Sequence, residues 1–120
     1  MTRLRVLVVD AEPSMLHLVA SVLSIPGYEV PMAPSPTQAL ELVKANPCFD
    51  LVVSDIVMTE MREPELVRKT KEVCPNTAFV LMSGHTADEA LPSEVEFISK
   101  PFLLPDLCSI VKQTLTHPAI

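Results

Sequence analysis

Hydrophobic residues in this 120-residue chain follow two patterns that alternate along its length. Short unbroken apolar runs, rich in β-branched residues, indicate strands that are covered on both faces. Such runs lie at 4–9, 28–32, 51–54, 77–82 and 95–99. The longer segments between them have apolar residues at helical spacing, so strands and helices are predicted to alternate.

Proline and capping residues mark where the predicted helices begin. Pro13, Pro64 and Pro105 each suit a first helical turn, and residues 35–38 have the pattern of a capping box. A further helix is expected near Thr86, although Pro92 would cut it short. The predicted inward faces are Met15, Leu18, Val19, Val22 and Leu23; Ala39, Leu40 and Val43; Leu66, Val67, Val73 and Cys74; and Leu107, Ile110, Val111 and Leu115.

The alternation of strands and helices predicts the fold class. It is typical of an α/β protein in which a parallel sheet has helices on both faces, joined by right-handed crossovers. The length fits one domain across 1–120, with 117–120 as a short tail. Pro31 cannot donate a hydrogen bond within a sheet, so the run at 28–32 is expected at the edge.

Composition and charge exclude several function classes. No apolar run approaches the roughly 18 residues of a membrane span. The formal net charge of −6 opposes non-specific binding to nucleic acid or to an anionic membrane. The chain opens without an export signal, and its three cysteines are widely spaced. We therefore predict a cytoplasmic protein whose Cys48, Cys74 and Cys108 are reduced, semi-buried thiols.

Four polar residues fall where predicted strands end. They are Asp10, Asp55, Ser83 and Lys100. Parallel sheets of this kind bind ligands at the carboxyl ends of their strands, so these side chains are expected to share one site. Two neighbouring carboxylates favour a bound Mg²⁺ ion, and a lysine and a hydroxyl opposite them suit a phosphoryl group.

The same residues carry a family resemblance. Val-Val-Asp at 8–10, the run 50–55 with Met58, Val-Leu-Met-Ser-Gly at 80–84 and Phe-Ile-Ser-Lys-Pro-Phe at 97–102 occur in order and at matching spacing. Together they resemble the receiver domain of two-component response regulators. The resemblance spans essentially the whole chain, and it implies a flavodoxin-like doubly wound domain with strand order 2-1-3-4-5.

The resemblance implies a role for each site residue. Asp55 would be the phosphoacceptor, taking a phosphoryl group from a phosphohistidine on a sensor histidine kinase or a histidine phosphotransfer domain. Asp10, Asp55 and the backbone carbonyl of Val57 would hold Mg²⁺. Ser83 would bond a phosphoryl oxygen and Lys100 would pair with it. Such a domain is not an enzyme beyond assisting its own phosphorylation and dephosphorylation.

The resemblance also implies a switch. Phe97 would follow Ser83 inward on phosphorylation, and a cis Lys100–Pro101 bond would place the lysine. The added charge would then bias an interaction surface formed by the fourth helix, the fifth strand and the last helix.

Two departures from the family pattern keep other functions open. Ala11 stands where the family usually has a second acid, so weaker Mg²⁺ binding is expected. Residues 59–63 lack the glycines usual in that loop. The alternative function is a pseudo-receiver, a phosphorylation-independent interaction module. An enzyme that binds a nucleotide or flavin is disfavoured, because no glycine-rich phosphate loop is present.

Simpler interpretations of the site residues also remain. Asp10 could be the N-cap of the first helix, and Asp55 could cap a nearby helix or turn. Ser83 could cap the helix after it, and Phe97 could be an ordinary core residue. The sequence does not separate a stand-alone domain from one excised from a longer protein such as a hybrid kinase.

Overall fold

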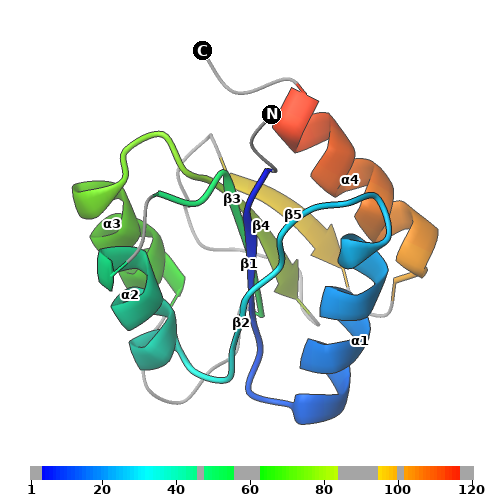
Figure 1. The fold of residues 1–120 in the computed structure, drawn as a ribbon, viewed down its shortest axis with the longest axis horizontal. Helices are drawn as coiled ribbons and strands as arrows, with labels where there is room; N and C mark the ends of the chain where they lie inside the picture. Colours follow the sequence, from blue (N-terminus) through cyan, green and yellow to red (C-terminus); the bar gives the residue numbers. More distant parts are fainter. Residues whose placement is uncertain (1–3, 46–47, 56–62, 84–94, 100–101, 117–120) are drawn as a thin grey trace.

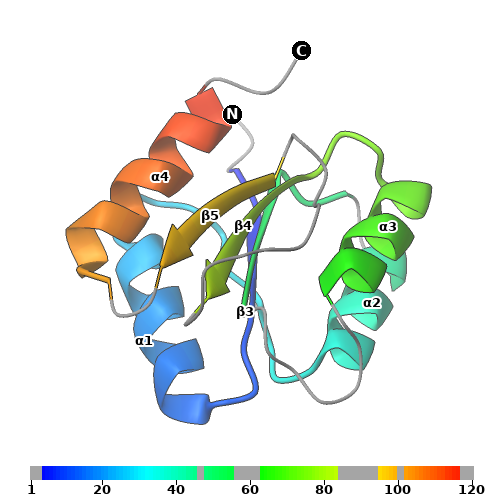
Figure 2. The same cartoon turned by 180° about the vertical axis from the view of Figure 1, so that it is seen from behind.

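The structure, a computed structural model, describes residues 4–45, 48–55, 63–83, 95–99 and 102–116. Five parallel strands form one sheet in the order β2-β1-β3-β4-β5. Helices α2 and α3 cover one face, and α1 and α4 cover the other (Figures 1 and 2). The elements are β1 (Val6–Val9), α1 (Pro13–Ser24), β2 (Met32–Ala33), α2 (Pro36–Ala45), β3 (Leu51–Asp55), α3 (Glu63–Val73), β4 (Ala78–Ser83), β5 (Val95–Ser99) and α4 (Leu104–Thr116).

This architecture confirms the predicted α/β class and the strand order. The helix expected near Thr86 lies outside the described residues. The last predicted helix, beginning at Pro105, corresponds to α4.

Two apolar layers explain why the strands have unbroken hydrophobic runs. On β1, Leu7 and Val9 enter the layer beneath α2 and α3, whereas Val6 and Val8 enter the layer beneath α1 and α4. All four side chains are fully buried. Because successive side chains of a strand point to opposite faces, a sheet covered on both sides requires apolar residues at every position.

Pro31 shortens the regular part of β2, the edge strand of the sheet. Three backbone N–H groups of the β1 segment donate to this part of the chain: Val6 to the Glu29 carbonyl, Val8 to the Pro31 carbonyl and Asp10 to the Ala33 carbonyl. Glu29 also donates to the Leu4 carbonyl, but Pro31, the next donor position, has no N–H. The chain from 29 to 33 is therefore aligned with β1, while the regular strand is limited to Met32–Ala33 and is shorter than the predicted run.

Helix α1 turns a different face to the sheet from the one predicted. Its buried residues are Leu16, Val19, Ala20 and Leu23, whereas Leu18 is 46% exposed. Apolar residues surround most of this helix, so two adjacent stripes fit the helical period and the sequence does not choose between them. Val73 is likewise exposed, because it lies at the last turn of α3.

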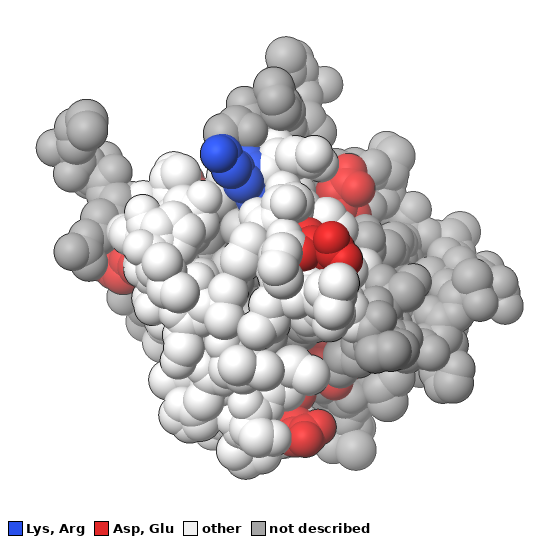
Figure 3. Space-filling model, turned by 90° about the vertical axis from the view of Figure 1, so that its right-hand side faces the viewer, with Lys and Arg blue, Asp and Glu red and all other residues white. Residues whose placement is uncertain are grey.

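The outer side of α1 is unusual in its lack of charge. No Asp, Glu, Lys or Arg occurs between Pro13 and Ser24. Figure 3 shows a broad area without charge on the side of the molecule where α1 and α4 lie.

The start of α2 agrees with its predicted cap. The Gln38 N–H donates to Ser35 Oγ at 3.2 Å, and the Ala39 N–H donates to the Ser35 carbonyl at 3.0 Å. Ser35 thus satisfies donors of the first turn that have no partner within the helix.

A polar network ties together the amino ends of the strands. The Arg5 N–H donates to Asp50 Oδ2 at 2.8 Å, and Arg5 Nε donates to Glu29 Oε2 at 2.9 Å. The Arg5 guanidinium lies 4.3 Å from the ring centre of Phe49, within cation–π range. These contacts hold the segments before β1, β2 and β3 against one another.

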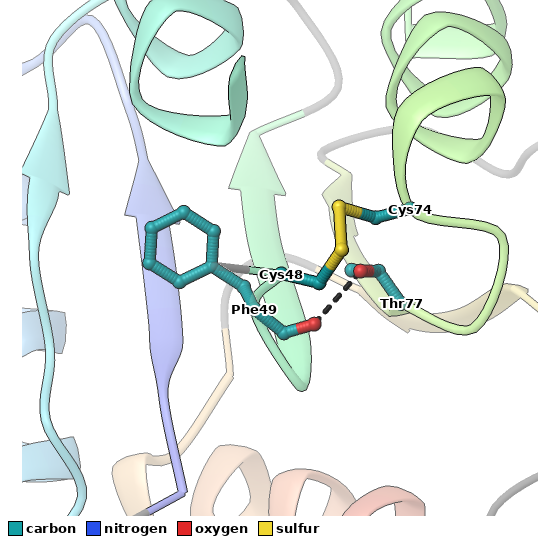
Figure 4. The surroundings of a disulfide bond; sticks show 4 residues. All are labelled: Cys48, Phe49, Cys74 and Thr77. Atoms are coloured by element: carbon teal, nitrogen blue, oxygen red, sulfur yellow. Dashed lines mark hydrogen bonds between the residues drawn. A yellow bond between two sulfur atoms is a disulfide. The ribbon is translucent and has the colours of Figure 1, made fainter. Parts of the chain in front are cut away.

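Cys48 and Cys74 form a disulfide beside this network, which corrects the prediction of reduced thiols (Figure 4). Cys48 precedes β3 and Cys74 follows α3, and their Cα atoms lie 5.6 Å apart. The β-α-β crossover brings the chain back to the edge of the sheet where β3 began. Their separation of 26 residues fits no sequence motif, so the fold creates this pairing. Cys108 is a free, half-buried cysteine, as predicted.

Thr77 links the turn after α3 to the entry of β3. Its buried hydroxyl donates to the Phe49 carbonyl at 2.7 Å. We predict that Thr77→Val lowers the free energy of unfolding by about 1–3 kcal/mol, because a buried carbonyl loses its donor.

The matched control for this change is Thr114→Val. The Thr114 hydroxyl donates to the Ile110 carbonyl within α4. In a helix, that carbonyl also accepts the backbone N–H four residues later, so it keeps a donor when the hydroxyl is removed. A change below about 0.5 kcal/mol is expected. Urea titration measures both variants, and equal losses would contradict a special role for the Thr77 bond.

Candidate functional site

The carboxyl edge of the sheet brings Asp10 and Asp55 together. Val9 of β1 is paired with Ser54 of β3, so Asp10 and Asp55 are the next residues along two neighbouring strands. Adjacent strands lie about 4.8 Å apart. Two residues earlier, Val8 and Val53 both pack in the layer beneath α1 and α4. Strand alternation therefore directs both carboxylates toward the same side of the sheet.

Asp10 is a buried carboxylate held by the turn that follows it. It is 1% exposed, and its Oδ1 accepts a hydrogen bond from the Glu12 N–H at 2.9 Å. The backbone N–H of Asp10 donates to the Ala33 carbonyl of β2 at 3.2 Å. Asp10 is not the N-cap of α1, since Glu12 occupies that position, but its carboxylate bonds the turn just before the helix.

Glu12 belongs to the surface part of this turn. It occupies the N-cap position of α1, and its carboxylate accepts a hydrogen bond from Ser14 Oγ at 3.0 Å. Both Ala11 and Glu12 are exposed. Asp10 is consequently the buried acid that this turn contributes.

Asp55 ends β3 and is half-buried. The fully buried Ser54 donates its hydroxyl to the Asp55 backbone carbonyl at 3.0 Å. Asp55 is paired with Met82 of β4, so its backbone is held between two strands while its side chain retains access to solvent. Partial exposure at a rigid strand end suits a reactive carboxylate.

The remaining predicted site residues are described to different extents. Ser83 ends β4 one residue beyond Met82, and it is paired with Ser99 at the end of β5, so its backbone lies at the same edge as Asp55. Phe97 is in β5 opposite Leu81. Lys100 and Val57 lie outside the described residues.

The donor set at this edge fits a magnesium ion that keeps part of its water shell. Within the described residues, no three His, Cys, Asp or Glu side chains gather as a metal cluster. Asp10 and Asp55 nevertheless offer hard oxygen donors from neighbouring strands. Mg²⁺ prefers such a partial site, with one or two carboxylates, water and phosphate oxygens.

The comparison with known families decides how this edge is interpreted. The family model of the response regulator receiver domain matches residues 6–112. The chain belongs to this family. It is therefore a receiver domain of two-component signalling, and the resemblance seen in the sequence is confirmed.

Relatives and solved structures agree with this membership. The sensor kinase CckA of Brucella abortus is 35% identical over 116 residues, which cover 92% of this chain and 12% of that kinase. The receiver protein CpdR of the same organism is 30% identical, covering 92% of this chain and 96% of CpdR.

Two solved receiver domains have the same fold. The structure of the receiver domain from the hybrid histidine kinase CckA has a TM-score of 0.83 and 29% identity, covering 92% of this chain and 98% of that one. A CheY-like receiver from Methanospirillum hungatei has a TM-score of 0.88 and 26% identity, covering 97% of this chain and 96% of that one.

Among the residues placed by the structure, no helix has the length and hydrophobicity needed to cross a membrane.

Proposed function

We propose that this receiver domain accepts a phosphoryl group on Asp55 from a phosphohistidine of a sensor histidine kinase or histidine phosphotransfer domain. The observation that carries the proposal is the pair formed by buried Asp10 and half-buried Asp55 at the ends of β1 and β3. Because histidine kinases draw on ATP, the reaction belongs in the cytoplasm. Beyond its own phosphorylation and dephosphorylation, the domain has no enzymatic activity in this proposal.

In the transfer step, a carboxylate oxygen of Asp55 attacks the phosphorus atom. An O–P bond forms, the N–P bond of phosphohistidine breaks, and its electron pair returns to the imidazole. Asp10, Asp55 and the Val57 carbonyl would hold Mg²⁺, which neutralises charge on the phosphoryl oxygens when bound. Ser83 and Lys100 would bind these oxygens, so the negative charge gained at Asp55 has partners on β4 and after β5.

The phosphorylated domain would differ from the unphosphorylated domain in the charge at the end of β3. A phosphoryl group brings about two negative charges and three acceptor oxygens. Movement of Ser83 toward these oxygens, with Phe97 following, would change the surface near β5 and α4 and alter the binding of a protein partner.

The direct test is phosphorylation by a small donor. Purified protein is incubated with acetyl phosphate and Mg²⁺, and intact mass spectrometry follows the product. We expect one phosphoryl group per chain, removed by hydroxylamine as an acyl phosphate should be, and lost when EDTA replaces Mg²⁺. No adduct at saturating Mg²⁺ would contradict the proposal.

That negative result would favour the pseudo-receiver alternative. Its motivation is Ala11, which removes one acid from the expected metal site, together with the glycine-free segment 59–63. A pseudo-receiver would bind its protein partner equally with and without acetyl phosphate.

Restoring the missing acid is expected to tighten metal binding. Ala11 is exposed directly beyond buried Asp10, so Ala11→Asp adds a carboxylate without disturbing the core. Since affinity rises with ligand charge, we predict at least about tenfold tighter Mg²⁺ binding, measured by calorimetric titration. Ala11→Asn is the uncharged control of the same size. Equal affinity of the two variants would show that the acid does not reach the ion.

A further inference from the structure

The Cys48–Cys74 pair joins two cysteines with very different exposure. Cys48 is exposed, whereas Cys74 is 1% exposed and packs in the core layer beneath α2 and α3. The backbone around both is fixed: the Cys74 N–H donates to the Thr70 carbonyl at 2.7 Å, and Thr77 bonds the carbonyl of Phe49, the residue after Cys48. Reduction of the disulfide would thus leave two sulfur atoms facing each other, one on an exposed residue and one on a buried residue (Figure 4).

We propose that Cys48 and Cys74 are a reversible thiol–disulfide site that reacts with small-molecule disulfides such as glutathione disulfide. Cys48 is the entry thiol and Cys74 is the resolving thiol. The proposal rests on the proposed function in one respect, the cytoplasmic location, because persistent structural disulfides are rare there and those that form are mostly transient and redox-sensing. A fixed structural bond would be expected in an oxidising compartment instead.

The reaction proceeds in two exchanges. The Cys48 thiolate attacks one sulfur of glutathione disulfide, forming a mixed disulfide and releasing one glutathione thiolate. The Cys74 sulfur attacks the Cys48 sulfur, its proton passing to the departing glutathione thiolate; this forms the Cys48–Cys74 bond and releases the second glutathione. Two protein thiols are oxidised, and one glutathione disulfide is reduced to two thiols. Burial of Cys74 prevents it from starting the sequence.

The disulfide lies far from Asp55 in the fold, although Asp55 lies between the two cysteines in the sequence. Cys48 and Cys74 lie at the amino ends of β3 and β4, the opposite edge of the sheet from Asp55. The closed loop contains all of β3, Asp55 and α3. Oxidation therefore links the start of the acceptor strand to the end of the next helix without occupying the acceptor site.

The test measures thiol chemistry on the full chain and does not depend on phosphorylation. Reduced protein carrying Cys108→Ser, which removes the third thiol, is treated with glutathione disulfide and followed by intact mass and thiol titration. We expect both remaining thiols to disappear with no glutathione retained at the end. Cys74→Ala in this background should retain one glutathione on Cys48, and Cys48→Ala should retain none.

Two results would overturn the proposal. One is a stable glutathione adduct on Cys48 while Cys74 is present, since a resolving thiol would displace it. The other is equal modification of the Cys48→Ala and Cys74→Ala variants, which would remove the assigned difference between the two thiols. If Cys74→Ala does not fold, early time points of the Cys108→Ser protein serve instead, with a transient glutathione adduct expected before the disulfide.

A second readout compares the oxidised and reduced forms of the same chain. Closing a loop of this length restricts the unfolded chain, so we expect the melting temperature of the oxidised form to be higher by about 10 °C. Equal melting temperatures would contradict a bond that restrains the β3–α3 segment. A failed phosphorylation assay would leave these thiol results unchanged, so the two proposals fail separately.

Discussion

Asp55→Asn is expected to abolish incorporation of phosphoryl groups from acetyl phosphate. The substitution replaces the attacking carboxylate by an amide of nearly equal size, which is a far weaker nucleophile and carries no charge for a cation. Asp55 is half-buried and its strand is held by β1 and β4, so the fold should tolerate this change. Intact mass after incubation with Mg²⁺ and donor measures the loss.

Asp50→Asn is the matched control for this experiment. Asp50 is the exposed residue before β3, at the opposite edge of the sheet, where it accepts the Arg5 N–H. We expect this variant to incorporate phosphoryl groups at the wild-type level, because the same chemical change lies outside the site. Retained labelling of Asp55→Asn would show that another residue accepts the phosphoryl group.

Leu7→Ala is expected to lower the free energy of unfolding by about 3–5 kcal/mol, a large share of a small domain's stability. Leu7 is fully buried on β1, which lies between β2 and β3, and it packs in the layer beneath α2 and α3. Truncation leaves a cavity that a sheet fixed on both sides cannot readily fill. Urea titration measures the change.

The same substitution at the surface provides the control. Leu103 precedes α4 and is 70% exposed, so Leu103→Ala should change the free energy of unfolding by less than about 0.5 kcal/mol. A similar loss in both variants would mean that Leu103 is covered in solution or that Leu7 is not packed as the structure shows.

The sequence predicted the sheet well because its signals are local. Unbroken apolar runs identified strands covered on both faces. The run with Pro31 was correctly expected at the edge, although the donor that Pro31 lacks is on the side facing β1. Strand ends then placed Asp10, Asp55 and Ser83 at one edge, since parallel strands end on the same side. The site is therefore predictable as far as it depends on where strands end.

Features that depend on packing were harder to predict. The inward face of α1 was assigned to a stripe containing Leu18, because apolar residues on nearly every side of a helix leave its rotation undetermined. The Cys48–Cys74 bond depends on a crossover that brings residues 26 positions apart to a Cα separation of 5.6 Å, and no local pattern records that distance. Lys100, Val57 and the side chain of Phe97 remain predictions, since they lie outside what the structure describes.

The charge-free helix α1 has a consequence for recognition. The chain carries a net charge of −6, yet none of its acidic or basic residues lies between Pro13 and Ser24. A protein that bound over this helix would find no Asp, Glu, Lys or Arg on it with which to form an ion pair. Selectivity among partners at this surface would therefore depend on the shapes of the side chains that meet.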